Sequence, residues 1–382
     1  MVLPHANWNY PTAIRFGAGR ISELGDACRA LGIARPLLVT DPALARLQMV
    51  EAAVAASGAG LFSAVQSNPA GADVEAGLAA YRQGGHDGIV AFGGGSALDA
   101  GKVIAFMSGQ SRPLWDFEDQ ADWWSRADPA GIAPVVAVPT TAGTGSEVGR
   151  AGVILDRDAG VKKIIFHPGM LPGIVILDPE LTLGLPAHVT AATGMDALSH
   201  CLEAYCAPGF HPMADGIAAE GMKQIREWLP RAVEDGSDIE ARGHMLAAAS
   251  MGATAFQKGL GGMHALSHPI GALLETHHGL TNAVLMPYML DFNRPAIEER
   301  LTRLAGYIGL EDSSFQGFLT WIIELRRSLG IPHTLGELGV SEADVERIAV
   351  MAEADPSAGG NPLPFGVAAA RSVLEAAMAG RV

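Results

Sequence analysis

A carboxylate and several imidazoles recur at four-residue spacing in the second half of this chain. Asp196 and His200 form one pair, His264 and His268 form another, and His278 follows. Side chains four residues apart lie on one face of an α-helix, so both members of each pair can contact the same ion or small ligand. An isolated histidine more often caps a helix or pairs with an acid, but two such pairs favour a metal site. Oxygen and imidazole donors suit Fe, Zn, Co, Ni or Mn ions, so the ion's identity stays open.

A glycine-rich loop in the first half indicates a second kind of chemistry. Gly93-Gly-Gly-Ser96 directly follows the apolar run 88–92, and a helical pattern with Asp99 and Lys102 comes next. The free N–H groups and the dipole at a helix N-terminus attract a phosphate, and glycine lets the phosphate approach. This loop is not a G-x-G-x-x-G fingerprint, and a triple glycine alone is more often a tight turn.

A second loop strengthens the prediction of a dinucleotide site. Pro139-Thr-Thr-Ala-Gly-Thr-Gly-Ser-Glu147 again follows an apolar run and is rich in glycine and hydroxyl groups. Loops at the carboxyl ends of neighbouring parallel strands form the crevice in which open α/β sheets bind ligands. Asp41 can accept hydrogen bonds from a ribose and would repel a 2′-phosphate, which favours NAD over NADP. The alternative is that Asp41 only caps a turn or a helix.

The elements that must position these residues change character near residue 186. Before it, short apolar runs alternate with helical patterns, which indicates a parallel sheet with crossover helices. The expected strands are 36–40, 61–65, 88–92, 134–139 and 174–177, and the expected helices are 43–56, 73–83 and 97–107. Runs 153–155 and 163–166 flank a turn-like segment and are expected to form a hairpin. After residue 186 the expected elements are helices at 187–205, 213–229, 239–256, 297–309 and 314–329.

Length, charge and cysteine content narrow the class of protein. The chain has 382 residues, and single cores stop growing at roughly 250 to 300 residues, so we expect two domains, 1–185 and 186–382. Its 26 basic and 41 acidic residues give a net charge of −15, which excludes nucleic acid and anionic membranes as natural partners. The chain has three cysteines and no C-x-x-C pair, which argues against a disulfide framework. We therefore expect the protein to be located in the reducing cytoplasm. Neither a secretion signal nor a membrane-spanning segment is expected.

In their order along the chain, these motifs resemble those of the iron-containing (group III) alcohol dehydrogenases. The matching segments are Gly93 to Ser96, Pro139 to Glu147, Gly194-Met-Asp-Ala-Leu-Ser-His200, and His264-Ala-Leu-Ser-His268-Pro-Ile-Gly271 through His278-Gly279. Phe16-Gly-Ala-Gly19 and Gly359-Gly-Asn-Pro362 extend the resemblance to nearly the whole length. It implies a dehydroquinate-synthase-like fold: an N-terminal nucleotide-binding α/β domain with a parallel sheet, an all-helical C-terminal domain, and NAD(P) and one divalent ion held between them.

The resemblance also assigns roles to individual residues. The metal ligands would be Asp196, His200, His264 and His278, and the implied ion is Fe²⁺, with Zn²⁺ as the alternative. His268 matches a histidine near the metal that relays protons, the alternative being that it only orients His264. His277 could compete with His278, but the family's ligand directly precedes a glycine, as His278 does. The cofactor contacts would be Asp41, Gly94, Gly95, Ser96, Asp99, Thr140, Thr141, Thr144, Ser146 and Lys162.

The implied activity is that of an NAD-dependent alcohol dehydrogenase or aldehyde reductase acting on a small alcohol or aldehyde, in a homodimer. A divalent cation eases deprotonation of an alcohol, so hydride can pass from the carbinol carbon to nicotinamide when the two carbons are about 3 to 3.5 Å apart. Residues 255–258 depart from the Phe-Ser-Asn of many relatives, so we expect a rebuilt pocket wall. Lys258 is expected to be solvated, with contact to a substrate anion as the alternative.

Other reactions remain possible on the same fold. A maleylacetate-reductase-like enzyme would not require the complete Asp and His set, and a polyol dehydrogenase is a further alternative. A dehydroquinate-synthase-type lyase should need several basic residues, but Lys258 is the only Lys or Arg between Ser250 and Leu280. A non-catalytic NAD- or metal-binding module is disfavoured because phosphate loops and metal ligands occur together, and NADH formation with a panel of alcohols would exclude it.

Overall fold

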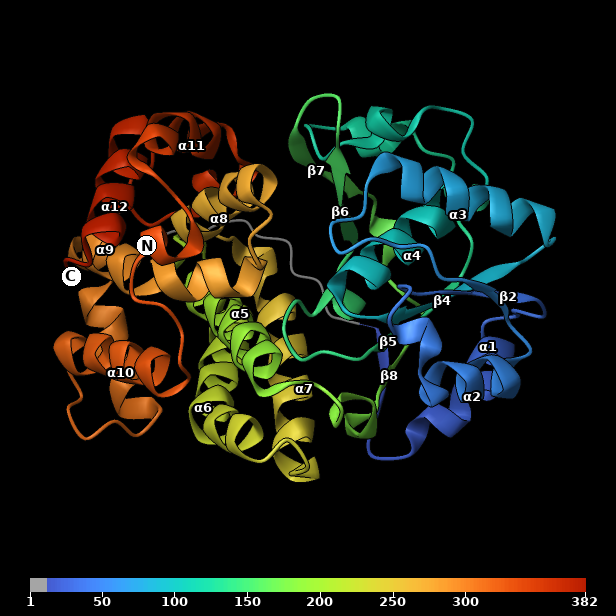
Figure 1. Cartoon of the computed structure of the whole chain (residues 1–382), viewed down its shortest axis with the longest axis horizontal. Coiled ribbons are helices and arrows are strands. Elements are labelled where there is room, and N and C mark those ends of the chain that lie inside the picture. Colours follow the sequence, from blue (N-terminus) through green and yellow to red (C-terminus); the bar gives the residue numbers. More distant parts are fainter. Residues whose placement is uncertain (1–11) are drawn as a thin grey trace. The chain divides into compact units, whose positions relative to one another are not determined.

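Two units make up the part of the chain that the computed structural model describes, residues 12–382. Residues 12–184 form an α/β unit and residues 185–382 form a helical unit (Figure 1). The expected fold class, a parallel-sheet α/β region followed by an all-helical region, is therefore confirmed.

The α/β unit is built on a six-stranded parallel sheet with the strand order β1-β8-β5-β4-β2-β3. Its strands are β1 (Ala13–Phe16), β2 (Pro36–Val39), β3 (Gly60–Phe62), β4 (Gly88–Gly93), β5 (Val135–Pro139) and β8 (Ile174–Leu177). Every residue of β2, β4, β5 and β8 is buried, as expected for parallel strands that are covered on both faces. In the ladder between β4 and β5, Gly93 lies opposite Pro139, so the two glycine-rich loops begin side by side at the carboxyl ends of these neighbouring strands.

Four helices and one hairpin complete this unit. The helices are α1 (Leu24–Ala30), α2 (Gln48–Ser57), α3 (Gly71–Gln83) and α4 (Gly95–Met107). The expected hairpin is present as β6 (Ala151–Asp156) paired antiparallel with β7 (Val161–Phe166). The prediction of one continuous helix at 43–56 is wrong, because Leu47 has an extended backbone that separates a short 3₁₀ turn from α2. Strand β1, at one edge of the sheet, was not expected from the sequence.

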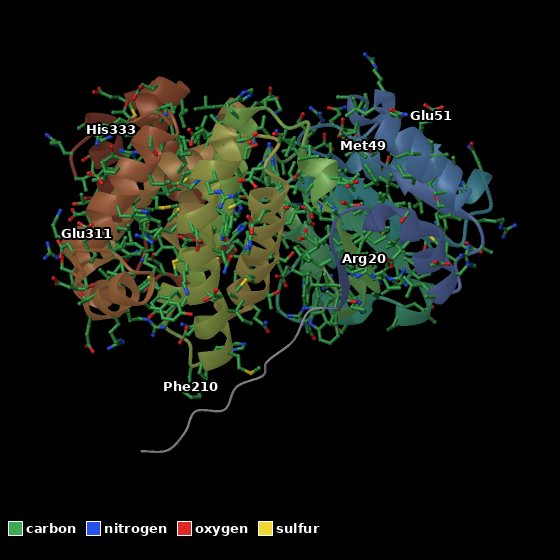
Figure 2. All side chains as sticks on the ribbon, turned by 90° about the horizontal axis from the view of Figure 1, so that it is seen from below. Arg20, Met49, Glu51, Phe210, Glu311 and His333 are labelled. Atoms are coloured by element: carbon green, nitrogen blue, oxygen red, sulfur yellow. The ribbon has the colours of Figure 1, made fainter. Side chains whose placement is uncertain are left out.

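Eight helices form the described helical unit. They are α5 (Ala187–Cys206), α6 (Pro212–Glu234), α7 (Ile239–Ala255), α8 (Gly262–Leu274), α9 (His278–Tyr307), α10 (Phe315–Ser328), α11 (Glu342–Ala354) and α12 (Val367–Ala379). The helix expected at 297–309 is only the last part of α9, which continues through Pro287 and Pro295. In the turn between α5 and α6, the side chain of Phe210 is 50% exposed and points outward (Figure 2).

Close helix packing in this unit depends on glycine. A Cβ atom at Gly252 of α7 would lie 3.0 Å from the Cβ atom of His200 on α5. At Gly221 of α6, a Cβ atom would lie 2.7 Å from the sulfur of Cys201. The three helices can therefore approach closely around the segment of α5 that carries the expected metal ligands. None of the helices in residues 12–382 is long and apolar enough to cross a membrane.

Candidate metal and dinucleotide sites

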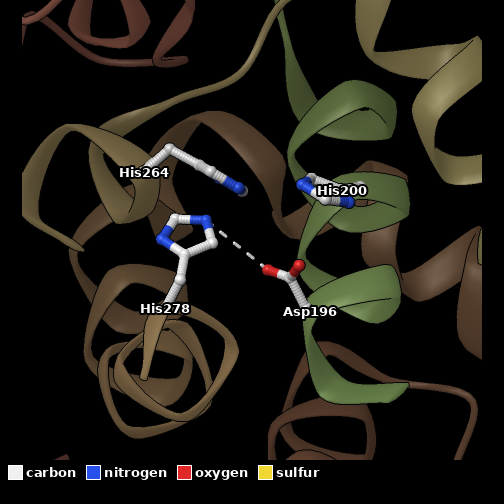
Figure 3. A group of neighbouring side chains, drawn as sticks. All are labelled: Asp196, His200, His264 and His278. Atoms are coloured by element: carbon white, nitrogen blue, oxygen red, sulfur yellow. Dashed lines mark ion pairs between the residues drawn. The ribbon is translucent and has the colours of Figure 1, made fainter. Parts of the chain in front are cut away.

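Four ligand-type side chains from three helices converge inside the helical unit (Figure 3). Asp196 and His200 lie one turn apart on α5, His264 is in the first turn of α8, and His278 is the first residue of α9. One oxygen or nitrogen atom from each side chain lies within 4.8 Å of the others. Asp196, His200 and His264 are buried, whereas the side chain of His278 is 28% exposed.

The donor atoms of this group face one another in a way that suits a cation. The amide nitrogen of Asn282 lies 3.0 Å from Asp196 Oδ1, 3.1 Å from His278 Nε2 and 3.3 Å from His264 Nε2. The amide group has two N–H donors and its nitrogen accepts no hydrogen bond, so it can donate to two of these three atoms. The amide oxygen Oδ1 of Asn282 is buried and has no hydrogen-bond partner within residues 12–382. One oxygen and three imidazole nitrogens at this spacing fit a divalent metal ion.

The side chain of His264 is hydrogen-bonded to a carboxylate that the sequence analysis did not identify. Glu203 follows His200 by one turn of α5, and its Oε2 atom accepts a hydrogen bond from His264 Nδ1 at 2.6 Å. Burial lowers the pKa of His264, but the charge and hydrogen bond of Glu203, together with the charges of Asp196 and Asp355, outweigh this effect, so the pKa lies above its usual value. Because this bond uses Nδ1, the nitrogen of His264 that faces the other ligands is Nε2.

His268 also pairs with a carboxylate that the sequence did not reveal. Its Nδ1 atom lies 2.8 Å from Asp355 Oδ2, and its ring stacks on the ring of His278 with the centroids 5.4 Å apart. Burial raises the pKa of Asp355, but the hydrogen bond and charge of His268, together with the hydrogen bonds from Ser357, lower it more, so the pKa falls below its usual value. The carboxylate that orients His264 is Glu203. The rings of His264 and His268 lie edge to face, with their centroids 5.8 Å apart.

His277 has a different place from its neighbour His278. It is the residue that caps the N-terminus of α9, and its Nδ1 atom accepts a hydrogen bond from the backbone N–H of Leu280 at 3.4 Å. The group of four side chains contains His278 and leaves His277 out.

Lys258 is buried, so the expectation that it is solvated is wrong. Only 1% of its side chain is exposed, and its Nζ atom lies 2.5 Å from Asp215 Oδ1 and 3.2 Å from the carbonyl oxygen of Tyr205. Arg300 holds the other carboxylate oxygen of Asp215 at 2.9 Å. Burial lowers the pKa of Lys258, and the Asp215 carboxylate opposes that shift. The ammonium is retained in the interior because a carboxylate and a carbonyl oxygen surround it.

The two glycine-rich loops of the α/β unit touch each other. A Cβ atom at Gly95, the first residue of α4, would lie 2.5 Å from Cγ2 of Thr144, and a Cβ at Gly94 would lie 3.5 Å from the side chain of Thr141. The backbone N–H of Thr140 donates to the carbonyl oxygen of Gly93 at 3.0 Å. The N-terminus of α4 and the threonine-rich loop are therefore packed closely against each other.

A polar network beneath these loops joins α4 to the hairpin. Ser146 Oγ donates to Asp99 Oδ1 at 2.5 Å, and the backbone N–H of Val153 donates to Asp99 Oδ2 at 3.0 Å. Lys102 Nζ donates to the carbonyl oxygen of Ser146 at 2.9 Å, and burial lowers the pKa of Lys102 while Asp99 opposes the shift. Burial likewise lowers the pKa of Lys162 on β7, and the negative charge of Asp99 opposes that shift. Asp99 thus holds Ser146 and the backbone of β6 together.

Asp41 and Ser96 already have partners within the α/β unit. Asp41 Oδ1 accepts hydrogen bonds from the backbone N–H groups of Ala43 and Leu44, each at 2.9 Å. The capping role considered for Asp41 is therefore real, and it uses one carboxylate oxygen. Ser96 Oγ donates to the carbonyl oxygen of Ser67.

Comparison with known proteins identifies the family. Residues 11–179 match the family model described as iron-containing alcohol dehydrogenase, and residues 190–378 match the model for the C-terminal part of the Fe-containing alcohol dehydrogenase family. The chain belongs to the iron-containing alcohol dehydrogenase family. It is therefore an enzyme, an alcohol dehydrogenase that acts on alcohols or aldehydes with a nicotinamide cofactor. Membership also implies a divalent metal ion, which the group of Asp196 and three histidines fits.

Relatives in this family match the chain over almost its whole length. The 4-hydroxybutyrate dehydrogenase of Cupriavidus necator is 40% identical, and the match covers 97% of this chain and 99% of the relative. A solved structure of 1,3-propanediol oxidoreductase superposes with a TM-score of 0.92 at 34% identity, covering 98% of this chain and all of that one. Sulfoacetaldehyde reductase from Bifidobacterium kashiwanohense, solved with NAD⁺, gives a TM-score of 0.89 at 29% identity over 98% of this chain and 99% of that chain.

Proposed function

We propose that this alcohol dehydrogenase holds Fe²⁺ through Asp196, His200, His264 and His278 and uses NAD to interconvert a small primary alcohol and its aldehyde. The convergence of these four donor atoms within 4.8 Å carries the proposal. A divalent ion there would stabilise the charge that develops on the substrate oxygen, by acting as a Lewis acid. Zn²⁺ also suits this ligand set and is the alternative ion.

His268 is the residue that we propose to carry the substrate proton toward solvent. Its Nδ1 atom is engaged by Asp355, so Nε2 is the nitrogen that can exchange a proton. Asp355 also accepts a hydrogen bond from the backbone N–H of Ser357 at 2.8 Å, which fixes the carboxylate. The imidazole ring is thereby held in one orientation, as a general acid or base must be.

The α/β unit is proposed to bind the dinucleotide. The N-terminus of α4 would receive the pyrophosphate, because glycine leaves its N–H groups accessible. Asp41 would bond the adenosine ribose through the carboxylate oxygen that does not cap the backbone, and so would favour NAD over NADP. The full proposed set of contacts is Asp41, Gly94, Gly95, Ser96, Asp99, Thr140, Thr141, Thr144, Ser146 and Lys162. We also propose that residues 1–185 and 186–382 are the nucleotide-binding and metal-binding domains.

The proposed substrate is a primary alcohol on a chain of three or four carbons with a second polar group at the far end. The names of two relatives, a 4-hydroxybutyrate dehydrogenase and a 1,3-propanediol oxidoreductase, share this chemistry. Lys258 is not the residue that binds a carboxylate of such a substrate, because its ammonium is buried against Asp215.

A cytoplasmic homodimer is the proposed assembly. Strand β1 lies at an edge of the sheet, and there the side chains of Ile14 and Phe16 are 38% and 49% exposed. An edge strand that carries exposed apolar side chains favours pairing with a second copy. The free, buried thiols of Cys28, Cys201 and Cys206 support a reducing compartment. Light scattering of the purified protein tests the dimer, and a monomer would contradict it.

The test of the proposed function combines metal analysis with a substrate screen. The freshly purified protein is expected to contain about one Fe²⁺ per chain and to form NADH with 1,3-propanediol, 4-hydroxybutyrate or 1-propanol. Chelation should abolish this activity, and Fe²⁺ or Zn²⁺ added back should restore it and so identify the better ion. Full activity in protein without bound metal, or no NADH with any alcohol of the panel at any metal loading, would refute the proposal.

A further inference from the structure

The side chain of Glu203 directs its hydrogen bonds to the beginning of α8. Its Oε2 atom accepts from the backbone N–H of Gly261 at 2.8 Å and from Nδ1 of His264 at 2.6 Å, and its Oε1 atom accepts from the backbone N–H of Met263 at 2.7 Å. The residue is only 8% exposed. A Cβ atom at position 261 would lie 2.9 Å from Oε1, so glycine is what allows the carboxylate to come this close.

The chemistry of this contact requires an ionised carboxylate. Three donors point at two oxygens, and an ionised carboxylate is the side chain that offers acceptors alone. The first N–H groups of a helix have no partner inside the helix, and the helix dipole favours a negative charge beside them. Glu203 therefore caps α8 from a different helix, α5, which carries Asp196 and His200.

The same carboxylate determines which nitrogen of His264 is free. In the neutral imidazole, the N–H group at Nδ1 donates a hydrogen bond to Glu203. The lone pair is then on Nε2, the nitrogen that faces the other three side chains. A histidine with the opposite tautomer would present an N–H to the ion and could not bind it.

We propose that Glu203 is a positioning residue that sets the metal affinity: it fixes the tautomer of His264 and joins the two helices that carry three of the four ligands. This inference rests on the metal site of the proposed function. It adds a residue outside the ligand set, and its failure leaves that site intact.

Glu203→Gln is the variant that tests the proposal, because the amide has one accepting atom and one donating group. With its oxygen toward His264, the amide N–H faces the N–H of Met263. In the other orientation, the amide N–H faces Gly261 and Nδ1 of His264. Metal affinity is measured on the metal-free full chain by competition between the protein and a chromophoric chelator for Zn²⁺. We expect an affinity 10- to 100-fold weaker than that of the unmodified protein, the usual effect of losing such a partner.

Asn361→Ala is the matched control for general loosening of α8. Asn361 Oδ1 accepts from the backbone N–H of Gly262 at 3.1 Å, so it caps the same helix without touching His264. This variant should lose thermal stability while its Zn²⁺ affinity stays within about threefold of that of the unmodified protein, since cap losses act on helix stability. An unchanged affinity in Glu203→Gln, or an equal loss in Asn361→Ala, would overturn the proposal.

A second measurement does not depend on how Glu203→Gln folds. In the unmodified, metal-free protein labelled with ¹⁵N-histidine, the signals of His264 are assigned by their loss in His264→Ala. At a pH high enough for the His264 ring to be neutral, we expect a proton on Nδ1 and none on Nε2, and the opposite tautomer would contradict the role of Glu203. The proposed function is tested separately, because His264→Ala should lose the metal whether or not Glu203 sets its affinity.

Discussion

Lys258→Met removes the buried ammonium and retains most of the apolar length of the side chain. Its Nζ atom is 2.5 Å from Asp215, and removing one partner of a buried ion pair costs about 3–5 kcal/mol because the other charge is stranded. Here Asp215 keeps Arg300 at 2.9 Å, and 27% of its side chain is exposed. The stranded charge therefore still has a cation and water. We expect a loss of about 2 kcal/mol in the free energy of unfolding, about 30-fold in the unfolding equilibrium.

The assay is urea denaturation of the metal-free protein followed by circular dichroism at a helix band, together with steady-state kinetics. Lys223→Met is the matched control, because Lys223 is exposed on α6 and its loss should change the unfolding free energy by less than about 0.5 kcal/mol. Asp215→Asn combined with Lys258→Met should cost less than the sum of the two single changes, because the residues touch. The KM values for 4-hydroxybutyrate and 1-propanol should change equally. Stability matching that of Lys223→Met, with KM raised only for the carboxylated substrate, would refute the buried ion pair.

Four further predictions follow from the two sites. His264→Ala should lose bound metal and activity together while NADH fluorescence titration shows unchanged cofactor binding; metal retained at one ion per chain would exclude His264 as a ligand. Asp41→Gly should raise the NADP/NAD ratio of kcat/KM, and an unchanged ratio would remove Asp41 from the ribose site. Gly95→Ala places a Cβ atom 2.5 Å from Thr144 Cγ2, and overpacking of about 1–3 kcal/mol should weaken NAD binding about 5- to 150-fold without altering metal content. Folding lowers the pKa of Asp355, so its carboxylate stabilises the protein above the unfolded pKa of about 3.9, and this contribution is lost as the pH falls through the lower folded pKa. Asp355→Asn should therefore reduce the fall in the free energy of unfolding between neutral and acid pH, as measured by denaturation curves. An unchanged pH dependence would contradict this role of Asp355.

The fold could be predicted where the local pattern and the tertiary structure agree. The apolar run at 88–92, the glycines and the helical pattern at 97–107 correspond to β4 and α4, because a strand, a tight turn and a helix each have their own local signal. Strand β1 has four residues and pairs with β8, so its existence depends on a partner far along the chain. Helix α9 continues through Pro287 and Pro295, where local propensity predicts a break and tertiary packing prevails.

The candidate site divides in the same way between local and distant signals. Asp196 and His200 could be recognised from their four-residue spacing. The same spacing would have found Asn282 after His278, and the three-residue helical spacing would have found Glu203 after His200. Asp355 gives no such signal, because 87 positions of the chain separate it from His268. Lys258 misled the sequence analysis because lysines are usually solvated, and its partner Asp215 lies 43 positions away.

The expected ligands of the ion and the side chains behind them belong to residues 185–382, whereas both glycine-rich loops belong to residues 12–184. If the proposed roles hold, recombination between relatives at the junction of these segments would transfer all the proposed coenzyme contacts together and leave the proposed metal ligands unchanged. Such a chimaera could acquire a new redox coenzyme without evolving a new metal centre, which offers a simple route to diversification by exchange of gene segments.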